Sequence, residues 1–282
     1  MNKYIVPVAL LVAASVMLLA IPFVEAGPGL GLPIVARYNG AVVVNGGSVK
    51  GTVKLKKLVD LPKLVVDKDV TTCSSAKVSP RLVVDSATKG VGNVVVFLDG
   101  IQTGKKLKTG AYLVDQKGCQ YDPHITIAAA GSKLNFGSSD AVLHNVHVWK
   151  GTPDQPHSKS KDVLNVAMPN DTVPDTPLSR RTMRKPGFYF VQCDAGHIWM
   201  SAYIWVVEHP YYVLTNGKGE FELKDVPAGT YTLRYWHEGW QATPEKSGGN
   251  VVGYAYGEPI QHRIQVTVAG GKATTADWTI PN

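Results

Sequence analysis

Hydrophobic and polar residues alternate over short stretches along most of this chain. Such stretches, when bounded by Gly, Pro, Asn, Asp or Ser, are typical of β-strands. In the first two thirds of the sequence they predict strands at 51–55, 94–98, 125–129, 133–136, 143–149, 187–193 and 202–207. Beyond the N-terminal segment, no stretch shows the 3.6-residue period of an amphipathic helix. The pattern therefore predicts an all-β protein.

The pattern changes at two places. Residues 150–179 contain five prolines among mainly polar residues, which predicts a long surface loop. A second unit begins near His209-Pro210. Its strands are expected at 211–214, 220–223, 233–236, 263–268 and 275–280. The chain of 282 residues is long enough for one or two domains with substantial cores.

The N-terminus has the pattern of a secretory signal peptide. Met1-Asn2-Lys3 is followed by an uncharged stretch at 4–24, and small residues precede Gly27. We expect cleavage after Ala26, with an uncleaved anchor helix as the alternative. After cleavage no segment is apolar enough to span a membrane. Residues 27–282 are therefore expected in the periplasm or outside the cell.

Composition and charge exclude several classes of function. The net charge is +7, and 18% of residues are charged. The positive charge suggests an acidic protein partner, and no nucleic acid is expected. The sequence contains no serine-protease order of residues, no zinc-protease motif, no paired carboxylates and no C-x-x-C-H haem attachment motif. We therefore do not expect an enzyme.

One short segment carries the most specific chemistry. An aromatic strand ends in Cys193, and His197 and Met200 follow within seven residues. Thiolate, imidazole and thioether are ligands of mononuclear copper sites that transfer electrons, and such a site needs one further histidine. His144, about fifty residues upstream, is the candidate. Zinc is the minor alternative because it gains little from a thioether.

These motifs resemble the cupredoxins, the plastocyanin-like blue copper family. The resemblance rests on the pair His144-Asn145 and on the strand from Pro186 to Cys193. It implies a Greek-key β-sandwich in which His144, Cys193 and His197 are the strong copper ligands and Met200 is the axial ligand. It also implies that Asn145 steadies the cysteine loop by hydrogen bonding.

The resemblance is closest to a secreted bacterial group of plastocyanin-like proteins, over residues 90–240. The C-terminal strands and the turn from Pro227 to Tyr231 also resemble a transthyretin-like sandwich, the carboxypeptidase regulatory-like domain. Together the resemblances imply a copper domain at 27–207, including an N-terminal extension, and a small β-sandwich at 208–282.

The ligand loop departs from the family in its spacing. The loop reads C-x3-H-x2-M, whereas plastocyanins have a shorter first gap and a longer second one. A dinuclear copper site would need a cysteine where Tyr189 stands, so one ion is expected. His147 is a possible extra ligand, although residues three apart on a strand point to opposite faces. A second copper held by His147, His124 or His237 would reopen the question of enzymatic activity.

Cys73 and Cys119 are the remaining cysteines. With Cys193 assigned to the metal, we expect these two to form a disulfide in an oxidising compartment, with two separate buried thiols as the alternative.

These observations favour a carrier of single electrons in which copper cycles between Cu(II) and Cu(I). An edge of His197 would approach the surface and meet a redox partner such as a cytochrome. The alternatives are a copper storage or delivery protein, and a structural cell-surface protein with a relict copper loop.

Overall fold

The computed structural model describes residues 37–61, 63–74, 76–169 and 180–281. The predicted signal peptide at 1–26 lies outside the described residues. Within the described ranges the regular secondary structure consists of β-strands and one helix, the single turn α1 (Val70–Cys73). The predicted all-β class is confirmed. No helix in these ranges is long and apolar enough to cross a membrane.

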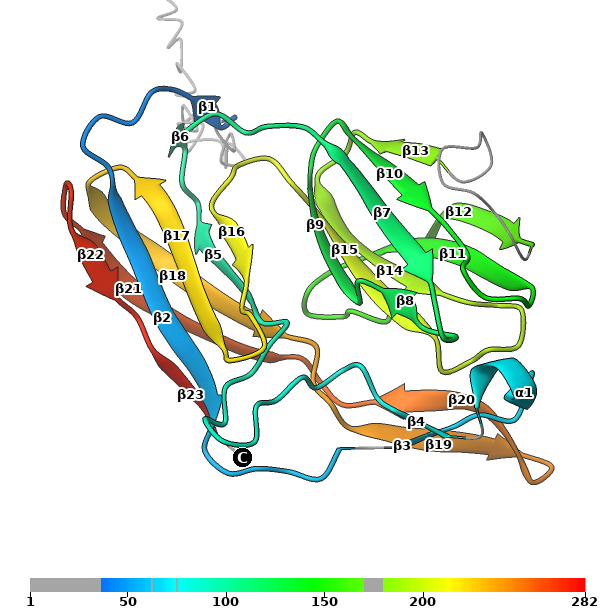
Figure 1. Ribbon diagram of the computed structural model, residues 1–282. Coiled ribbons are helices and arrows are strands. Elements are labelled where there is room, and N and C mark those ends of the chain that lie inside the picture. The colour runs from blue at the N-terminus through cyan, green and yellow to red at the C-terminus, as the bar shows by residue number, and fades with distance from the viewer. Residues whose placement is uncertain (1–36, 62, 75, 170–179, 282) are drawn as a thin grey trace, which may run out of the picture. The chain divides into compact units, whose positions relative to one another are not determined.

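The metal ligands predicted from the sequence belong to a sandwich of two sheets (Figure 1). One sheet has the order β13-β10-β7-β8 and the other the order β12-β11-β14-β15-β9. The strands of the first are β7 (Ala111–Gln116), β8 (Tyr121–Asp122), β10 (Ser132–Phe136) and β13 (Arg180–Met183). Those of the second are β9 (Ile125–Ala129), β11 (His144–Gly151), β12 (Lys161–Met168), β14 (Gly187–Gln192) and β15 (Ser201–Val207).

The central strands of the five-stranded sheet are covered on both faces. All seven residues of β15 are buried. On β14, Tyr189 and Val191 join the core between the two sheets, whereas Phe188 and Phe190 join a separate aromatic cluster. This alternation follows from the two-residue period of a strand. It explains why the sequence of β14 is hydrophobic throughout rather than alternating with polar residues.

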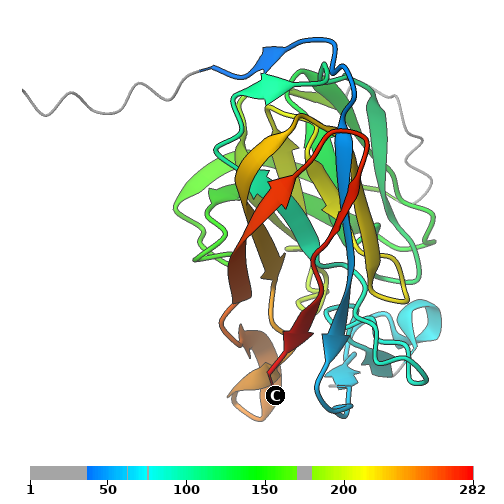
Figure 2. The same cartoon turned by 90° about the vertical axis from the view of Figure 1, so that its left-hand side faces the viewer.

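A second sandwich is built from both ends of the chain (Figure 2). One of its sheets has the order β16-β5-β18-β21, and the other has β17-β2-β22 with β23 also pairing with β2. The strands are β2 (Gly47–Leu55), β5 (Val95–Asp99), β16 (Tyr212–Leu214), β17 (Glu220–Val226), β18 (Gly229–His237), β21 (Ile260–Val268), β22 (Ala273–Thr275) and β23 (Trp278–Ile280). The domain boundary expected after Val207 falls between β15 and β16. The second sandwich nevertheless contains β2 and β5, which precede this boundary in the sequence.

An aromatic layer joins the two sandwiches. Val96 and Leu98 of β5 point into the core of the second sandwich, while Val95 and Phe97 pack against β14 and β15. Trp205 and Trp236 meet in this layer, with ring centroids 5.4 Å apart. Because these rings bury large apolar areas on both sides, the layer fixes the two sandwiches as one body.

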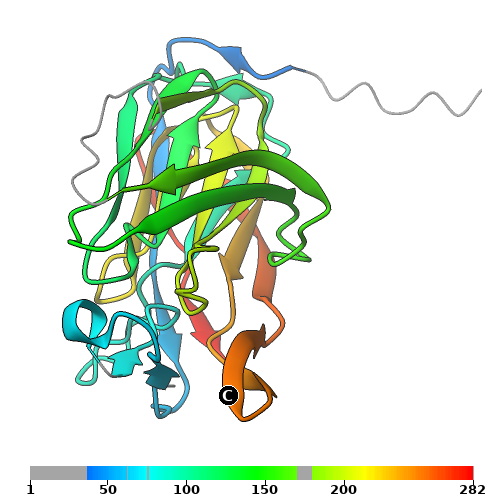
Figure 3. The same ribbon diagram turned by 90° about the vertical axis from the view of Figure 1, so that its right-hand side faces the viewer.

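The loop predicted at 150–179 is wrong in its first part. β11 continues to Gly151, and β12 (Lys161–Met168) pairs with it antiparallel (Figure 3). β12 is an edge strand with mostly exposed side chains. An edge strand needs few apolar residues, so its sequence looks like a polar loop. Residues 170–179 lie outside the described part of the chain.

Short elements complete the described chain. These are β1 (Asn39–Gly40) with β6 (Thr103–Gly104), β3 (Lys63–Val65) with β4 (Ala76–Val78), and β19 (Ala242–Ser247) with β20 (Asn250–Tyr256). The turn α1 lies between β3 and β4 and carries Cys73. Cys73 and Cys119 form the expected disulfide, with their Cα atoms 5.3 Å apart. The disulfide therefore joins α1 to the turn between β7 and β8.

Candidate metal centre

Three residues predicted as metal ligands meet at one end of the first sandwich. His144 is the first residue of β11, and Cys193 directly follows β14. β11 and β14 are paired antiparallel, with His147 opposite Gln192. The start of one strand therefore lies beside the end of the other. His197 is in the turn from β14 to β15, which closes through a hydrogen bond from the Met200 N–H to the His197 carbonyl at 2.9 Å.

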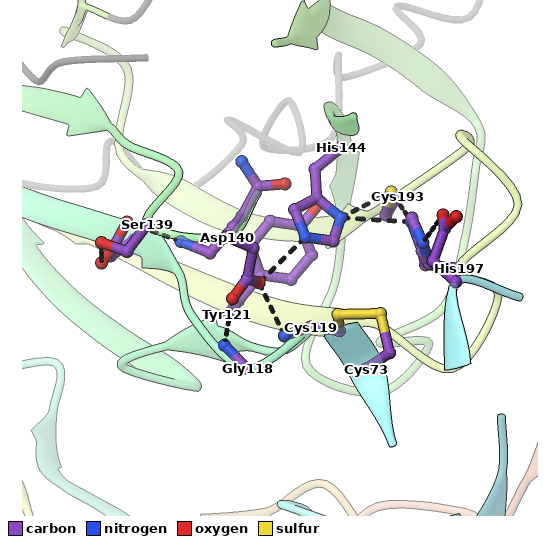
Figure 4. Close-up of polar contacts among 12 residues, drawn as sticks. Cys73, Gly118, Cys119, Tyr121, Ser139, Asp140, His144, Cys193 and His197 are labelled. Carbon is purple, nitrogen blue, oxygen red and sulfur yellow. Dashed lines mark hydrogen bonds and ion pairs between the residues drawn. A yellow bond between two sulfur atoms is a disulfide. The ribbon is translucent and has the colours of Figure 1, made fainter. Parts of the chain in front are cut away.

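The ligand atoms of these residues converge (Figure 4). The Nδ1 atoms of His144 and His197 are 3.1 Å apart. The Cys193 sulfur lies 4.0 Å from the first and 3.7 Å from the second. Both histidines are 0% exposed and Cys193 is 1% exposed. We call these three residues the metal group.

Each histidine is held from behind by a carboxylate. His144 Nε2 lies 2.9 Å from Asp140 Oδ2, and His197 Nε2 lies 2.9 Å from Asp69 Oδ2. An imidazole that donates its Nε2–H to a carboxylate has a lone pair on Nδ1. Both Nδ1 lone pairs then point towards the same small volume as the thiol. In this tautomer the three groups form a set of donors that a single cation could bind.

The Asp140 carboxylate also binds the segment that carries the disulfide. It accepts hydrogen bonds from the backbone N–H groups of Gly118 and Cys119, at 2.6 and 2.7 Å. Asp69 directly precedes α1, the turn that ends at Cys73. The disulfide therefore links the two segments that hold the two histidines, which fixes their rings relative to each other.

Burial sets the protonation of the metal group. It lowers the pKa of His144, against the opposing effect of its hydrogen bond to Asp140. It also lowers the pKa of His197, and the neighbouring His144 acts in the same direction. Both imidazoles are therefore neutral near pH 7 and able to bind a cation. Burial raises the pKa of the Cys193 thiol, while backbone N–H groups of Ala195, Asn145 and His197 lower it by donating to the sulfur.

Asn145 is hydrogen-bonded to the cysteine loop. Its Oδ1 accepts a hydrogen bond from the backbone N–H of Asp194 at 3.3 Å. Its Nδ2 donates to Asn165 Oδ1 at 2.8 Å, which ties the loop to β12. Met200 is 1% exposed and belongs to the same hydrophobic core as Cys193.

His147 lies outside the metal group. Its Nδ1 contacts the Asp194 carboxylate, and its Nε2 is 2.9 Å from Asp162 Oδ2. Its ring packs on Trp149, with centroids 3.6 Å apart. His144 and His147 thus have separate partners, as expected for residues three apart on a strand.

The structure contradicts one expectation about the surface. An edge of His197 was expected to approach solvent, but the residue is 0% exposed. Asp69 covers its Nε2, and this carboxylate is itself 36% exposed. The covering segment is about 130 residues away in sequence, so the local pattern of the ligand loop contains no sign of it.

A second buried group of charges surrounds Arg81, and we call it the arginine cluster. Arg81 Nη1 lies 2.7 Å from Glu238 Oε2, and the other Glu238 oxygen contacts His124 Nε2. Arg81 also donates to the Tyr203 hydroxyl at 3.0 Å, and His157 Nε2 lies 2.7 Å from that hydroxyl. Burial would raise the pKa of Glu238, but Arg81 and His124 lower it to about 2.

Sequence reasoning missed Asp69, Asp140 and the arginine cluster. Asp140 lies four residues before His144. Its spacing could have suggested a partner for His144. Asp69 and Arg81 lie far in sequence from the residues they contact, so no local signal identifies them. In the described part of the chain, the groups of three metal-type ligands are the metal group and Cys119, Asp140 and His144, which share His144.

Comparisons with solved structures find copper proteins at low similarity. The chain is 19% identical to amicyanin from Paracoccus versutus, with a TM-score of 0.28, over 36% of this chain and 86% of that one. It is 18% identical to auracyanin A, a "blue" copper protein from Chloroflexus aurantiacus, with a TM-score of 0.28, over 34% and 98%. It is 19% identical to the copper-containing nitrite reductase from Thermus scotoductus, with a TM-score of 0.29, over 38% and 24%.

Similarity at this level carries no argument about function. No protein-family model and no curated protein matches the chain. The geometry of the metal group therefore has to support any proposal by itself.

Proposed function

We propose that this chain is an extracytoplasmic copper protein that carries single electrons between redox partners. The observation that supports this most strongly is the convergence of two imidazole Nδ1 atoms and one thiol, 3.1–4.0 Å apart and buried. His144, Cys193 and His197 would hold one ion, and Met200 would be the axial ligand.

The donor set fits copper. Thiolate and thioether sulfur stabilise Cu(I), and imidazole suits both oxidation states. Bound copper would supply the one-electron chemistry by cycling between Cu(II) and Cu(I). The three backbone N–H groups directed at the Cys193 sulfur stabilise its thiolate form. Asp69 and Asp140 fix the orientation of the histidine rings, so the ligands move little when the charge of the centre changes.

Burial favours a carrier over a delivery protein. Delivery requires a copper acceptor to reach the ligands and exchange with them. The three residues of the metal group are at most 1% exposed, and the Cys73–Cys119 disulfide fixes the segments around them. An electron can pass through the residues that cover the metal group. A ligand from a copper acceptor can reach the metal group only if the protein opens locally.

The proposed location and partner extend this function. A disulfide persists in an oxidising compartment, which fits export to the periplasm or the cell exterior. The net charge of +7 fits an acidic redox partner such as a cytochrome. We propose no nucleic-acid partner and no substrate that reacts at the metal.

Copper reconstitution of the full chain tests this function. The Cu(II) protein should show an intense visible thiolate-to-copper absorption band and a matching electron paramagnetic resonance spectrum. Cys193→Ser should lose the band, because an alkoxide does not replace the thiolate. Asp162→Asn is the matched control, since it removes a partner of His147 rather than of the metal group.

Redox cycling then distinguishes carrier from delivery protein. A carrier is reduced and reoxidised reversibly by a cytochrome c without losing copper. Transfer of the copper to a chelating acceptor faster than electron exchange would support delivery instead. Binding of zinc with no coloured copper form would overturn the proposal.

A further inference from the structure

A cavity lies between the two sandwiches, at the end of the first sandwich opposite the metal group. Its volume is ≈ 620 Å³, and it is lined by residues of β7, β9, β15 and β16, of the segments before β7 and between β15 and β16, and by Asp225 of β17. β15 runs from Ser201, next to the ligand loop, to Val207 at the cavity. At about 3.3 Å per residue the cavity is about 20 Å from the metal group. The two sites therefore share no residues.

The inner wall of the cavity is apolar and aromatic. Its aliphatic residues are Ile127 and Ala129 of β9, Val207 of β15, and Val213 and Leu214 of β16. Tyr112, Tyr212 and His209 add aromatic rings, and the rings of His209 and Tyr212 lie 4.7 Å apart. A volume of this size with both apolar and polar groups in its wall is typical of sites for small molecules.

The rim of the cavity carries three lysines, and two of them have no ion-pair partner among the described residues. Lys105 is occupied, because its Nζ donates to the Lys224 carbonyl at 2.7 Å and lies 3.6 Å from Asp225. Lys106 and Lys108 also line the cavity and are exposed. Within the described ranges these two side chains make no hydrogen bond or ion pair. Two free ammonium groups therefore stand at the mouth of an apolar cavity.

Two further polar groups of the cavity lining, His209 and Tyr212, can also donate hydrogen bonds. His209 Nδ1 accepts the backbone N–H of Tyr211 at 3.3 Å, so the neutral ring carries its proton on Nε2. Burial lowers the pKa of His209 to about 4, which keeps the ring neutral. Burial raises the pKa of Tyr212, which keeps its hydroxyl protonated. Neither group has a hydrogen-bond acceptor among the described residues.

We propose that this cavity binds a small organic anion with an aromatic body, of the aromatic carboxylate or sulfonate class. The anionic group is recognised by Lys106 and Lys108, with His209 Nε2–H and the Tyr212 hydroxyl as uncharged donors. The ring packs against Ile127, Val207 and Leu214. The site is independent of the proposed electron transfer, because it uses other residues at the other end of the sandwich.

Fluorescence titration of the copper-loaded full chain with 1-anilinonaphthalene-8-sulfonate tests the site. This probe combines an aromatic body with one negative charge and becomes fluorescent in an apolar environment. We expect saturable binding of one probe per chain that weakens as salt is added. Lys106→Gln with Lys108→Gln should weaken binding at least fivefold. Ile127→Trp, which fills the cavity, should abolish it.

Matched controls separate this site from unspecific binding. Lys161→Gln with Lys246→Gln removes two exposed charges elsewhere and should leave the affinity unchanged. N-phenyl-1-naphthylamine, the same ring system without the sulfonate, should bind at least tenfold more weakly. Equal affinity of the two probes, or equal effects of the two lysine pairs, would overturn the proposal. The surface lysine variants test it even if Ile127→Trp does not fold.

Discussion

The metal group and the arginine cluster are both buried, and both pair histidines with carboxylates, yet they differ in where their positive charge comes from. In the arginine cluster, the guanidinium of Arg81 lies 2.7 Å from the Glu238 carboxylate and supplies the cation itself. In the metal group, both carboxylates lie behind the histidines, and the lone pairs in front converge with a thiol.

This difference shows how a structural cluster can be told from a binding site. A buried carboxylate with its own arginine has its charge offset within the protein, and removal of the arginine would leave that charge uncompensated. Three electron-pair donors directed at one another are incomplete without an added cation. The number of histidines does not distinguish the two groups, since His124 and His157 contact the arginine cluster as closely as His144 and His197 contact each other.

The largest expected effect concerns the cation of the arginine cluster. Arg81→Met leaves the Glu238 carboxylate buried without its partner, and should lower the free energy of unfolding by about 3–5 kcal/mol. Urea unfolding of the copper-free protein measures this. Arg234→Met is the control, because its ion pair with Asp99 is exposed and is expected to contribute below about 1 kcal/mol. An equal loss of unfolding free energy in Arg81→Met and Arg234→Met would mean that the buried arginine contributes no more to stability than the exposed one.

The next effect concerns the metal group, where copper binding should stabilise the fold. Copper at a free concentration 1,000-fold above its Kd should raise the free energy of unfolding by about 4 kcal/mol. Thermal unfolding with and without a chelator measures the gain. Cys193→Ser should lose most of it, while Arg81→Met should keep it from a lower starting point. A gain of equal size in Cys193→Ser would place the copper elsewhere.

Substitution of Asp69 or Asp140, the carboxylates behind the histidines, should have a smaller effect, which is a loss of copper affinity. Asp69→Asn and Asp140→Asn should each weaken binding by about 10–100-fold, because the rings lose their fixed orientation and their basicity falls. Asp140→Asn should be the more severe, since Asp140 also accepts two backbone N–H groups. Competition with a coloured chelator measures the affinities. Asp162→Asn is the matched control and should bind copper normally.

The smallest effect is a pH dependence of stability that belongs to the arginine cluster. Burial lowers the pKa of His157 to about 3, with Arg81 acting in the same direction, so the folded state keeps this ring neutral. The unfolded chain binds the proton below about pH 6.5. The stability contributed by neutral His157 is therefore complete above pH 6.5 and falls as the pH drops towards 3.

His157→Gln should remove this part of the acid sensitivity. The slope of unfolding free energy against pH, between 6.5 and 4.5, should become shallower by up to about 1.4 kcal/mol per pH unit. Urea midpoints at several pH values measure the slope. Glu238 contributes only at lower pH, because its folded pKa of about 2 lies below its unfolded value. An unchanged slope would mean that His157 is protonated without cost.

Much of the fold was predictable because strands and turns leave local signals. The strand expected at 125–129 matches β9 (Ile125–Ala129), and the one at 202–207 differs from β15 by one residue. The edge strand β12 was missed because its partner, not its own composition, makes it a strand. The pairing of β2 and β5 with C-terminal strands was also missed, because strand pairing across the chain leaves no trace in either segment alone.

By itself the sequence determined the β-structure and the approach of Cys193 to His197, because four residues in one turn cannot lie far apart. It also predicted His144 as their partner and the Cys73–Cys119 disulfide, through a family resemblance and the count of cysteines. The tertiary structure alone decided which carboxylates hold the histidines, that His197 is covered rather than exposed, and that Arg81 neutralises Glu238. These are contacts between segments 4 to 157 residues apart, and their strength depends on burial and distance, which only the folded chain defines.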